Sequence, residues 1–308
     1  MKCLVTGATG FIGRRLCPEL SAGGHDVTPL SLHGGALADG SPSIALDLAQ
    51  DVPGDVFDGV DVVFHLAGIA HQQAEPGQYE ALNHLGTLRL AQAALAAGVK
   101  HFIFLSSVKA MGSADSGAPR AETDCNLPGD AYGLSKWRAE CALRELCRDT
   151  AMALTVLRPA LVYGAGVKGN LDLLARGIRW GLPRPPQGGK RSMIALDDLV
   201  GLLVHLVTEP PGGQHTWIAA AESYTAREVY DALRSAAGRG PGRAWAPRWA
   251  WRGAAFVFDR LRGADGTWDK LFGAELYDNA ALLADTGWRP GSHLRDSAPA
   301  MVRGRAVP

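Results

Sequence analysis

Short apolar runs alternate with helical patterns through the first half of the chain. The runs are rich in β-branched, leucine and aromatic side chains, end near Gly, Ser or Ala, and occupy residues 3–6, 26–30, 62–66 and 102–105. Leucines at helical spacing fill residues 81–97, and a further apolar run follows at 153–157. Strands that alternate with helices predict an α/β fold, with a doubly wound parallel sheet covered by helices on both faces.

The composition of the chain and its pattern of predicted elements change near residue 160. Glycine and proline become dense, as in residues 181–189, and helical patterns are separated by loops. We therefore expect a sheet domain over residues 1–160. A smaller, mostly helical lobe is expected over residues 161–308, with some of its elements returning to the sheet.

Three tryptophans stand among basic residues in the segment 245–252. Such a segment is compatible with binding to a membrane surface or to a nucleic acid. We favour the simpler interpretation, in which the tryptophans cover the core of the small lobe together with Phe256 and Phe258.

The charge balance limits the range of partners. Lys and Arg total 31 and Asp and Glu total 31, so no overall field attracts nucleic acid, and any anionic ligand must be bound by local groups. The five cysteines are scattered and form no metal-binding pattern, as expected in a reducing compartment. A glycine already at residue 7 leaves no room for a signal peptide, and no apolar run is long enough for a membrane span. We expect a cytoplasmic protein without a bound metal.

A glycine-rich turn follows the first predicted strand and opens a helix. Glycines at this spacing allow a tight turn, close approach of the backbone to a pyrophosphate and close helix–strand packing, while the helix N-terminus offers N–H groups to phosphate. The spacing is GxxGxxG, which differs from the standard GxGxxG. Its position nonetheless predicts a Rossmann-type dinucleotide site, with contacts from Gly7, Thr9, Gly10, Phe11, Ile12, Gly13 and Arg14.

The end of the second strand bears on the choice between NAD and NADP. An acidic residue there would bind the ribose hydroxyls of NAD and repel the 2′-phosphate of NADP, but this slot holds Ser31. Ser31, His33 and Arg14 are potential donors to a phosphate, so NADP is favoured over NAD. Asp47, followed by Leu48, is placed either to touch the adenine or to cap a turn.

Tyr132 and Lys136 are four residues apart at the start of a predicted helix, and so share one face. A free tyrosine is too weak an acid for proton transfer at neutral pH, and a neighbouring ammonium group lowers its pKa. Ser106 and Ser107 end the strand 102–105 at the edge of the sheet where ligands bind. A serine there can hold a substrate oxygen against the tyrosine.

Together these motifs resemble the extended short-chain dehydrogenases/reductases, and in particular the NAD-dependent epimerase/dehydratase group that acts on nucleotide sugars. The resemblance rests on the glycine turn, on the Tyr132/Lys136 pair and on the segments 66–68, 83–87 and 106–107. Matches to the family's motifs are frequent up to about residue 165 and fewer afterwards. It implies that Ser107, Tyr132 and Lys136 are catalytic and that Asn83 supports nearby backbone or a water. It also implies that Leu66, Ala67, Gly68, Asn83, Tyr132 and Lys136 line the cofactor, and that the chain forms a homodimer through the helices that begin near Asn83 and Tyr132.

Weaker matches in the second half point to the substrate. By resemblance, the segment 190–194 contains an arginine that grips a pyrophosphate, and the bidentate guanidinium of Arg191 suits phosphate oxygens. The remaining expected substrate contacts are Ser107, Lys109, Asn170, Leu171 and Lys270. These residues favour a nucleoside-diphosphate sugar, and among these a UDP-sugar.

Enzymes of the family that the chain resembles catalyse three reactions that have to be distinguished here. Dehydration needs a carboxylate beyond the strand-end serine, where this chain has Val108 and Lys109. A 4-epimerase oxidises and re-reduces carbon 4 and keeps its NAD, whereas a 4-ketoreductase delivers hydride once and exchanges its cofactor, which is often NADPH. Because Ser31 replaces the acidic residue, the sequence favours a UDP-sugar 4-ketoreductase of the UDP-N-acetylhexosamine type over UDP-glucose or UDP-N-acetylglucosamine 4-epimerase. An inactive dinucleotide-sensing scaffold is the alternative of another class.

Overall fold

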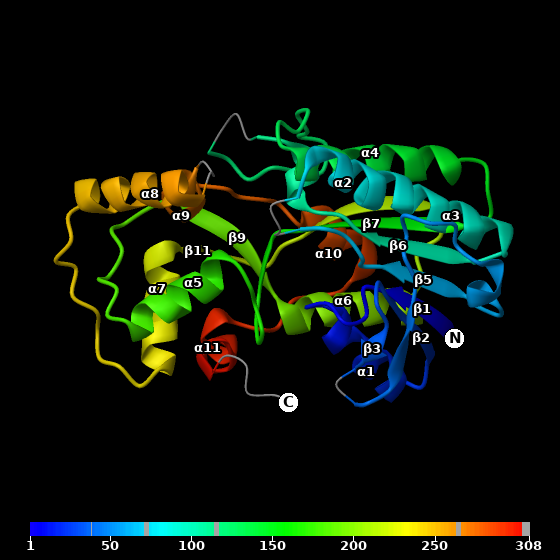
Figure 1. The fold of residues 1–308 in the computed structure, drawn as a ribbon, viewed down its shortest axis with the longest axis horizontal. Coiled ribbons are helices and arrows are strands. Elements are labelled where there is room, and N and C mark those ends of the chain that lie inside the picture. The colour runs from blue at the N-terminus through cyan, green and yellow to red at the C-terminus, as the bar shows by residue number, and fades with distance from the viewer. Residues whose placement is uncertain (38, 71–73, 114–116, 263–265, 304–308) are drawn as a thin grey trace.

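The computed structural model describes residues 1–37, 39–70, 74–113, 117–262 and 266–303, which form two lobes joined along one side (Figure 1). The larger lobe is built on an eight-stranded sheet in the order β10-β7-β6-β5-β1-β2-β4-β3, in which every pair is parallel except β3 with β4. Its strands are β1 (Lys2–Thr6), β2 (Asp26–Ser31), β3 (Gly35–Ala36), β4 (Pro42–Ala45), β5 (Val62–His65), β6 (His101–Leu105), β7 (Ala153–Pro159) and β10 (Gln214–Ala219). This arrangement confirms the predicted α/β fold class.

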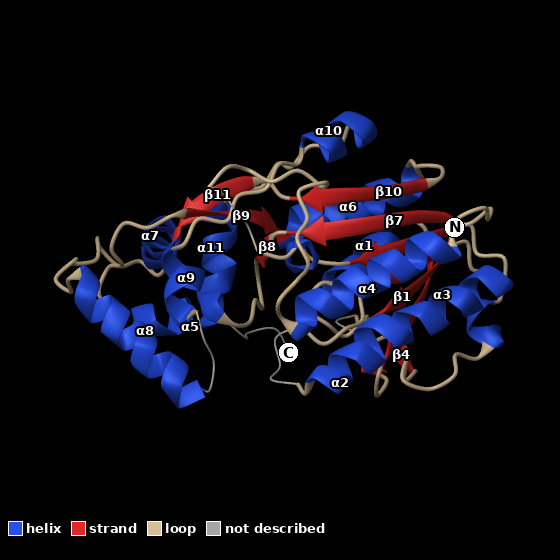
Figure 2. Ribbon diagram, turned by 90° about the horizontal axis from the view of Figure 1, so that it is seen from above, coloured by secondary structure: helices blue, strands red, loops and turns tan. Residues whose placement is uncertain are grey.

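Helices cover both faces of this sheet (Figure 2). One face packs on α1 (Gly13–Ala22) and α6 (Leu196–Thr208), and the other on α3 (Thr87–Ala96) and α4 (Ala131–Leu146). Because successive strand residues point to opposite faces, Cys3 and Val5 join the first core while Leu4 joins the second. Smaller elements are α2 (Pro76–Tyr79), α10 (Ala280–Thr286) beside β10, and the 3-10 turns Gly54–Phe57 and Val108–Met111.

The second lobe surrounds a small three-stranded sheet. Strands β8 (Leu161–Tyr163), β9 (Lys190–Ala195) and β11 (Glu222–Thr225) pair in the order β11-β9-β8. The helices of this lobe are α5 (Asn170–Arg179), α7 (Ala226–Ala236), α8 (Arg248–Arg262), α9 (Thr267–Phe272) and α11 (Leu294–Arg303). Its own core includes Tyr163, Leu174, Ile178, Tyr230 and Leu233. The lobe therefore has its own packing centre, separate from the two cores of the large sheet.

The chain passes between the lobes several times. After β8, α5 and β9 it returns to the large sheet through α6 and β10, and then continues into β11 and α7. Helix α6 begins at Leu196, directly after the last residue of β9, Ala195. The two lobes are therefore connected by short segments of regular structure.

The predicted helix at residues 81–97 contains a change of pitch. Residues Glu80–Gly86 form a π-helical segment that continues into α3. Asn83, in the middle of this segment, is fully buried, and the hydroxyl of Thr87 donates to its backbone carbonyl (2.7 Å). π-Helical turns are rare and are frequent at functional sites.

The prediction that the tryptophans of 245–252 cover a core is wrong for two of the three. Trp245 is 72% exposed and Trp249 is 78% exposed, and Phe256 on the same helix is 68% exposed. Only Trp251 turns inward, where its ring meets Phe272 edge-on. Helix α8 packs on α9, and Ala255 is buried on the covered side of the helix.

Candidate active site

The glycine turn between β1 and α1 is packed too closely for side chains. Gly7 has a φ of +69°, and a Cβ there would lie 2.9 Å from the backbone nitrogen of Ala67. A Cβ on Gly13 would collide with the carbonyl of Gly7, and one on Gly10 would lie 2.9 Å from the same oxygen. The turn is closed by a hydrogen bond from the Gly10 N–H to the Gly7 carbonyl (2.9 Å). The glycines thus bring the start of α1 against the ends of β1 and of the loop after β5.

The start of α1 has the features of a phosphate site. The helix begins without a side-chain cap and has no acidic residue in its first turn, which leaves its N-terminal N–H groups and positive dipole available to an anion. Thr9, Phe11 and Ile12 are half-buried around the turn, and Arg14 is exposed beside it. These residues fit the pyrophosphate of a dinucleotide.

Most of the residues expected around the adenosine are hydrogen-bonded or buried within the fold. Ser31 is buried, and its hydroxyl donates to the Gly34 carbonyl (2.9 Å) and meets the Ser43 hydroxyl (2.8 Å), so it has no hydrogen left for a 2′-phosphate. Asp47 caps a turn by accepting from the Ala49 N–H (2.9 Å). The Leu48 side chain is buried, and His33, two residues after Ser31, is exposed. The hydroxyl of Ser31 is therefore used within the fold, which argues against a phosphate contact, and the contact of Ser31 with the cofactor stays a prediction.

The loop after β5 connects the glycine turn to the predicted catalytic lysine. Leu66 and Ala67 are half-buried, and the Ala67 N–H donates to the Thr6 hydroxyl (3.2 Å). Asn83 fixes the next part of the loop, since its amide accepts from the Ile69 N–H (2.8 Å) and donates to the Ile69 carbonyl (3.0 Å). A Cβ on Gly68 would lie 3.3 Å from Lys136 Nζ. The structure thus brings the loop, Asn83 and Lys136 together.

Tyr132 and Ser107 face each other at the N-terminus of α4. The helix begins after Asp130, whose carboxylate accepts from the Gly133 N–H (2.9 Å), and Gly133 lets the helix approach the carbonyl of Lys109. Burial raises the pKa of Tyr132 to about 12, and a hydrogen bond with Ser107 opposes that rise. The phenol is therefore a proton donor at neutral pH, and a further positive charge is needed to make it a base.

Lys136 is a buried cation one helical turn from Tyr132. Its ammonium group donates to the Leu105 carbonyl at the end of β6 (2.9 Å) and lies 4.6 Å from the centre of the Phe104 ring. Burial lowers its pKa to about 8, while the carboxylate of Glu140 favours the charged form. Lys136 is positively charged at pH 7 and lies where it can stabilise a phenolate on Tyr132.

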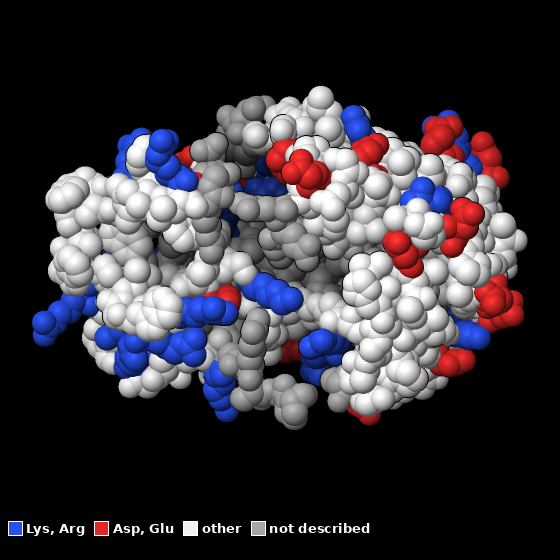
Figure 3. Space-filling view, in the orientation of Figure 1, with Lys and Arg blue, Asp and Glu red and all other residues white. Residues whose placement is uncertain are grey.

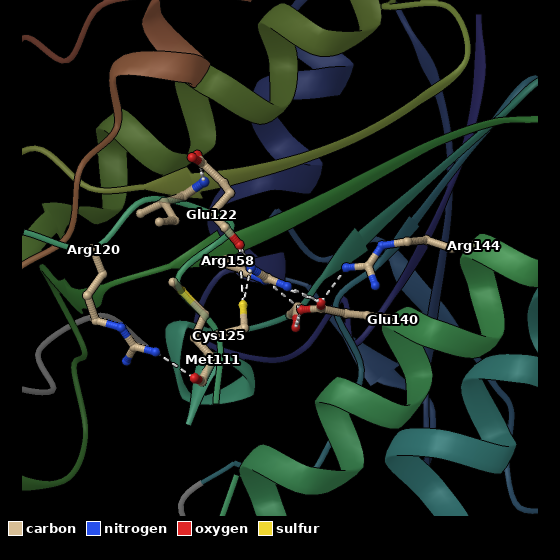
Figure 4. A network of polar contacts seen from close by, with 9 residues as sticks. Met111, Arg120, Glu122, Cys125, Glu140, Arg144 and Arg158 are labelled. Atoms are coloured by element: carbon tan, nitrogen blue, oxygen red, sulfur yellow. Dashed lines mark hydrogen bonds and ion pairs between the residues drawn. The ribbon is translucent and has the colours of Figure 1, made fainter. Parts of the chain in front are cut away.

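The two adjacent serines at the end of β6 have different environments. Ser106 is buried and donates to Glu140 (2.5 Å), whereas Ser107 faces Tyr132 and accepts from the Lys109 N–H (3.2 Å). Glu140 also binds Arg158 of β7 (2.6 Å) and Arg144 (2.7 Å), as Figure 4 shows. This buried network attaches the middle of α4 to β6 and β7. It holds the helix that carries Tyr132 and Lys136 in place.

Arg158 and Arg120 extend the same network toward the loop 120–126. Arg158 donates to the Glu122 carbonyl (2.9 Å) and to the sulfur of Cys125 (3.4 Å). Arg120 is buried and donates to the carbonyls of Met111 (2.6 Å) and Gly112 (2.8 Å), next to the turn that follows Ser107 (Figure 4). The loop is thus fixed over the sheet end by two arginines.

Lys109 and Arg191, both expected to bind substrate, meet on a residue that the sequence did not indicate. The carboxylate of Glu275 accepts from Lys109 Nζ (2.9 Å) and forms an ion pair with Arg191. Tyr277 donates to the same carboxylate (2.7 Å). Glu275 is far from both cations in sequence, so no spacing could have revealed it. Two cations from different lobes thus converge on one anionic group.

The other expected substrate contacts differ in their exposure to solvent. Asn170 is exposed as the first residue of α5, and Lys270 is exposed on α9, where its carbonyl accepts from Arg191 (3.1 Å). The side chain of Leu171 is buried in the core of the small lobe, where it packs with Tyr163 and its neighbours, and its contact with the substrate stays a prediction.

The molecular surface is hollowed between the two lobes, and Lys and Arg side chains lie on both sides of the hollow (Figure 3). In the described ranges no group of three His, Cys, Asp or Glu residues is arranged to hold a metal ion. Within the same residues, no helix has the length and apolar character required to cross a bilayer. A glycine turn at β1 and a Tyr/Lys pair beside a strand-end serine, on this fold, define a nicotinamide-dependent enzyme of the short-chain dehydrogenase/reductase class.

Comparison with known proteins gives the family. Residues 3–219 match the NAD dependent epimerase/dehydratase family. The chain is 30% identical to UDP-glucose 4-epimerase of Vibrio cholerae over 305 residues, which is 95% of this chain and 92% of that protein. The fold is similar to that of MoeE5 in complex with UDP-glucuronic acid and NAD, with a TM-score of 0.80, 24% identity and 98% of both chains covered. It is also similar to UDP-glucose 4-epimerase of Thermotoga maritima with UDP-glucose, with a TM-score of 0.79, 23% identity and 98% of both chains covered. The chain belongs to the NAD-dependent epimerase/dehydratase family of extended short-chain dehydrogenases/reductases.

This membership confirms the family and the enzyme class expected from the motifs, and with Tyr132 and Lys136 both present it argues against the inactive scaffold. The family is NAD-dependent, whereas a preference for NADP stays a prediction. The individual roles of the site residues likewise stay predictions that rest on the geometry above.

Proposed function

We propose that this chain is an NAD-dependent 4-epimerase of UDP-hexoses. The observation that carries the proposal is the similarity to UDP-glucose 4-epimerase of Vibrio cholerae along almost the whole of both chains. The environment of Ser31 supports it, because a hydroxyl that already donates to Gly34 offers no hydrogen to a 2′-phosphate. An enzyme that keeps its cofactor through each turnover needs no preference for the phosphorylated form.

The chemistry assigned to the chain is proton transfer at the substrate's 4-hydroxyl. NAD held at the glycine turn would supply the group that accepts a hydride from carbon 4 and gives it back. Tyr132 takes the hydroxyl proton as carbon 4 is oxidised to the ketone, and returns it when the ketone is reduced from the other face. Ser107 donates a hydrogen bond to the same oxygen and so holds it against the phenol. The reaction is redox-neutral overall, because the hydride and the proton that leave the substrate both return to it.

Lys136 is assigned a supporting electrostatic role in this exchange. The pKa of Tyr132 is about 12 with Lys136 already in place, so the phenol must be acidified further before it can act as a base. The ammonium group of Lys136, with a pKa of about 8, is charged at pH 7 and favours the phenolate. A positively charged, oxidised nicotinamide bound at the site would further favour the phenolate.

The diphosphate of the substrate is assigned to Lys109 and Arg191. Both cations already bind one anionic group, the carboxylate of Glu275. Oxygens of a diphosphate would offer the same chemistry to a guanidinium and an ammonium group. Glu275 thus forms ion pairs with the two cations that the substrate diphosphate would need.

A UDP-N-acetylhexosamine 4-ketoreductase is the second candidate, favoured by one observation. The residues directly after β2, from Leu32 to Leu37, contain no carboxylate that would repel a 2′-phosphate. Such an enzyme would use Tyr132 only as a proton donor, which suits its pKa of about 12.

The proposed oligomer is a homodimer built on α3 and α4, which lie side by side on the outer face of the large lobe (Figure 1). Leu85, at the start of this surface, is 41% exposed despite its apolar side chain. Sedimentation of the wild type and of Leu85→Glu tests this: a dimer that becomes a monomer supports it, and a wild-type monomer contradicts it.

One experiment separates the two reactions. The cofactor released from purified protein is identified, and the protein is then assayed with UDP-glucose, UDP-N-acetylglucosamine and a 4-keto-6-deoxy UDP-sugar. Retained NAD with interconversion of 4-epimers supports the epimerase. Consumption of added NADPH only with the keto sugar overturns it in favour of the ketoreductase.

A further inference from the structure

Helix α8 carries large apolar side chains on a face that the described part of the chain leaves exposed to solvent. Trp249, Phe256, Val257 and Leu261 are 78%, 68%, 55% and 82% exposed, and Trp245, just before the helix, is 72% exposed. Trp249 and Phe256 are seven residues apart, so they lie on the same side of the helix. The helix runs along the outer rim of the small lobe in both ribbon views (Figures 1 and 2). Exposed apolar groups gathered in this way mark an interaction surface.

The same stretch is strongly basic, although the whole chain has no net charge. Between residues 234 and 260 there are six arginines, no lysine and one acidic residue, Asp259. That carboxylate accepts from the N–H of Thr267 (3.2 Å), at the start of α9, and is half-buried. In Figure 3, Lys and Arg outnumber Asp and Glu on the visible face of the small lobe, while the large lobe shows both signs. The partner of this surface therefore carries negative charge.

Arginines flank the apolar groups on the exposed side of α8. Arg260 lies between Phe256 and Leu261, and Arg252 follows Trp249 by one turn. Arg248 and Arg252 lie 5.5 and 5.9 Å from the centre of the Trp268 ring, which holds their guanidinium groups at the edge of the apolar face. An apolar strip bordered by cations on a convex helix is the arrangement of helices that lie in the headgroup region of a bilayer.

We propose that α8 docks this enzyme onto an anionic lipid surface. Trp249, Phe256 and Leu261 enter the boundary between headgroups and acyl chains, and Arg252 and Arg260 bind lipid phosphates. Aliphatic groups on the strip favour lipid over nucleic acid, which would use aromatic stacking in a basic groove. The arginines favour an anionic bilayer over a second copy of this chain, because two such basic faces would repel each other.

The docking surface lies close to Arg191 of the proposed diphosphate site. Helix α8 packs on α9, and α9 provides the Lys270 carbonyl that accepts from Arg191 (3.1 Å). A bilayer bound to α8 would therefore lie on the side of the small lobe next to the proposed diphosphate site. The inference does not depend on which reaction the enzyme catalyses.

The test uses co-sedimentation of the full chain with vesicles of phosphatidylcholine alone or with about 30 mol% phosphatidylglycerol, which gives a strongly negative surface. We expect binding to the anionic vesicles only, weakened at high salt, with a blue shift of tryptophan fluorescence. Arg252→Glu/Arg260→Glu and Trp249→Ser/Phe256→Ser should each lower the bound-to-free ratio by about tenfold or more.

Two controls match these changes on the large lobe. Leu127→Ser removes an exposed apolar side chain (69% exposed), and Arg148→Glu reverses an exposed charge. Both should bind vesicles like the wild type. Failure to bind anionic vesicles, equal binding to both vesicle types, or equal losses in the controls would each overturn the proposal. If the α8 variants changed the sedimentation of the protein in the absence of vesicles, the face would bind a second copy of the chain, and the proposal would be overturned. Preferential binding of the wild type to an oligonucleotide over vesicles would also overturn it.

Discussion

Gly68 lies so close to Lys136 that a Cβ on the glycine would be 3.3 Å from the lysine Nζ. The same Cβ would be 3.0 Å from the Asn83 side-chain oxygen, so both neighbours would have to move by a few tenths of an ångström. The glycine thus determines how closely the loop after β5 approaches the proton-transfer pair.

Gly68→Ala is expected to lower kcat by about tenfold, because small displacements of a catalytic group have large effects on rate. Its effect on the free energy of unfolding should be small, since no backbone strain is introduced. Steady-state kinetics and urea unfolding measure the two quantities. The control is Gly212→Ala, which meets no atom within 4 Å. A Gly68→Ala enzyme with wild-type kcat would show that this approach does not matter for catalysis.

Tyr132→Phe is expected to lower turnover by about 10²–10⁴-fold while NAD binding persists, because the change removes only the proton donor. Turnover is measured in the epimerase assay, and cofactor content by absorbance of the purified protein. Ser106→Ala provides a contrast: its hydroxyl bonds Glu140 inside the fold, so stability should fall and kcat should stay within a few-fold. Unchanged turnover in Tyr132→Phe would remove the phenol from the mechanism.

Arg191 and Glu275 are predicted to have opposite effects on substrate binding. Arg191→Ala should raise KM more than it lowers kcat, because a phosphate contact is lost equally from the ground state and the transition state. Glu275→Gln should tighten binding of UDP by about threefold to tenfold, because it removes a competing anion from Lys109 and Arg191. Steady-state kinetics measure the effect of Arg191→Ala, and calorimetric titration with UDP measures the effect of Glu275→Gln. Weaker binding of UDP to Glu275→Gln would show that the carboxylate positions the cations and does not compete for them.

Lys136→Met is predicted to change the pH dependence of stability. The pKa of Lys136 is about 8 in the folded chain and ~10.4 in an unfolded one. Between these pH values the unfolded chain binds the proton and the folded chain does not, so the wild type gains stability as pH rises from 8 to 10. The gain in the free energy of unfolding is about 2 kcal/mol, because a tenfold difference in proton affinity corresponds to about 1.4 kcal/mol and most of the difference titrates in this range.

The variant lacks this titration, so its stability should rise less over the same range. Urea unfolding of the cofactor-free proteins at pH 8, 9 and 10 makes the comparison. Tyr132, whose pKa is raised, affects stability only above pH 10 and is present in both chains. Parallel stability curves for wild type and variant would contradict the burial of a lysine ammonium group.

The sequence predicted the large sheet well, because strands buried on both faces leave strong apolar runs such as 102–105 and 153–157. Ser107, Tyr132 and Lys136 were predicted from local motifs at the ends of regular elements, and the structure brings Ser107 and Tyr132 together, while their catalytic roles stay predictions. Glu140 could have been found as well, since it stands four residues after Lys136 on the same helix.

What the sequence did not reveal depends on distant contacts. Glu275 reaches Lys109 across 166 residues, and no local pattern records such a pairing. The competing partners of the Ser31 hydroxyl, Gly34 and Ser43, became visible only with the pairing of β2 and β4. The exposed tryptophans were misjudged because a Trp-rich helix has the same composition whether it faces a core or solvent.

The return of the chain to the large sheet through β10 determines what a shortened form of this protein would be. Strand β10 pairs with β7 along six residues, from Gln214 to Ala219. A fragment that stopped at residue 160 would keep the glycine turn and the Tyr132/Lys136 pair. It would, however, leave β7 as an edge strand, with unpaired backbone N–H and C=O groups along one side. Such an edge can pair with another chain, so we expect a fragment without the second half to self-associate.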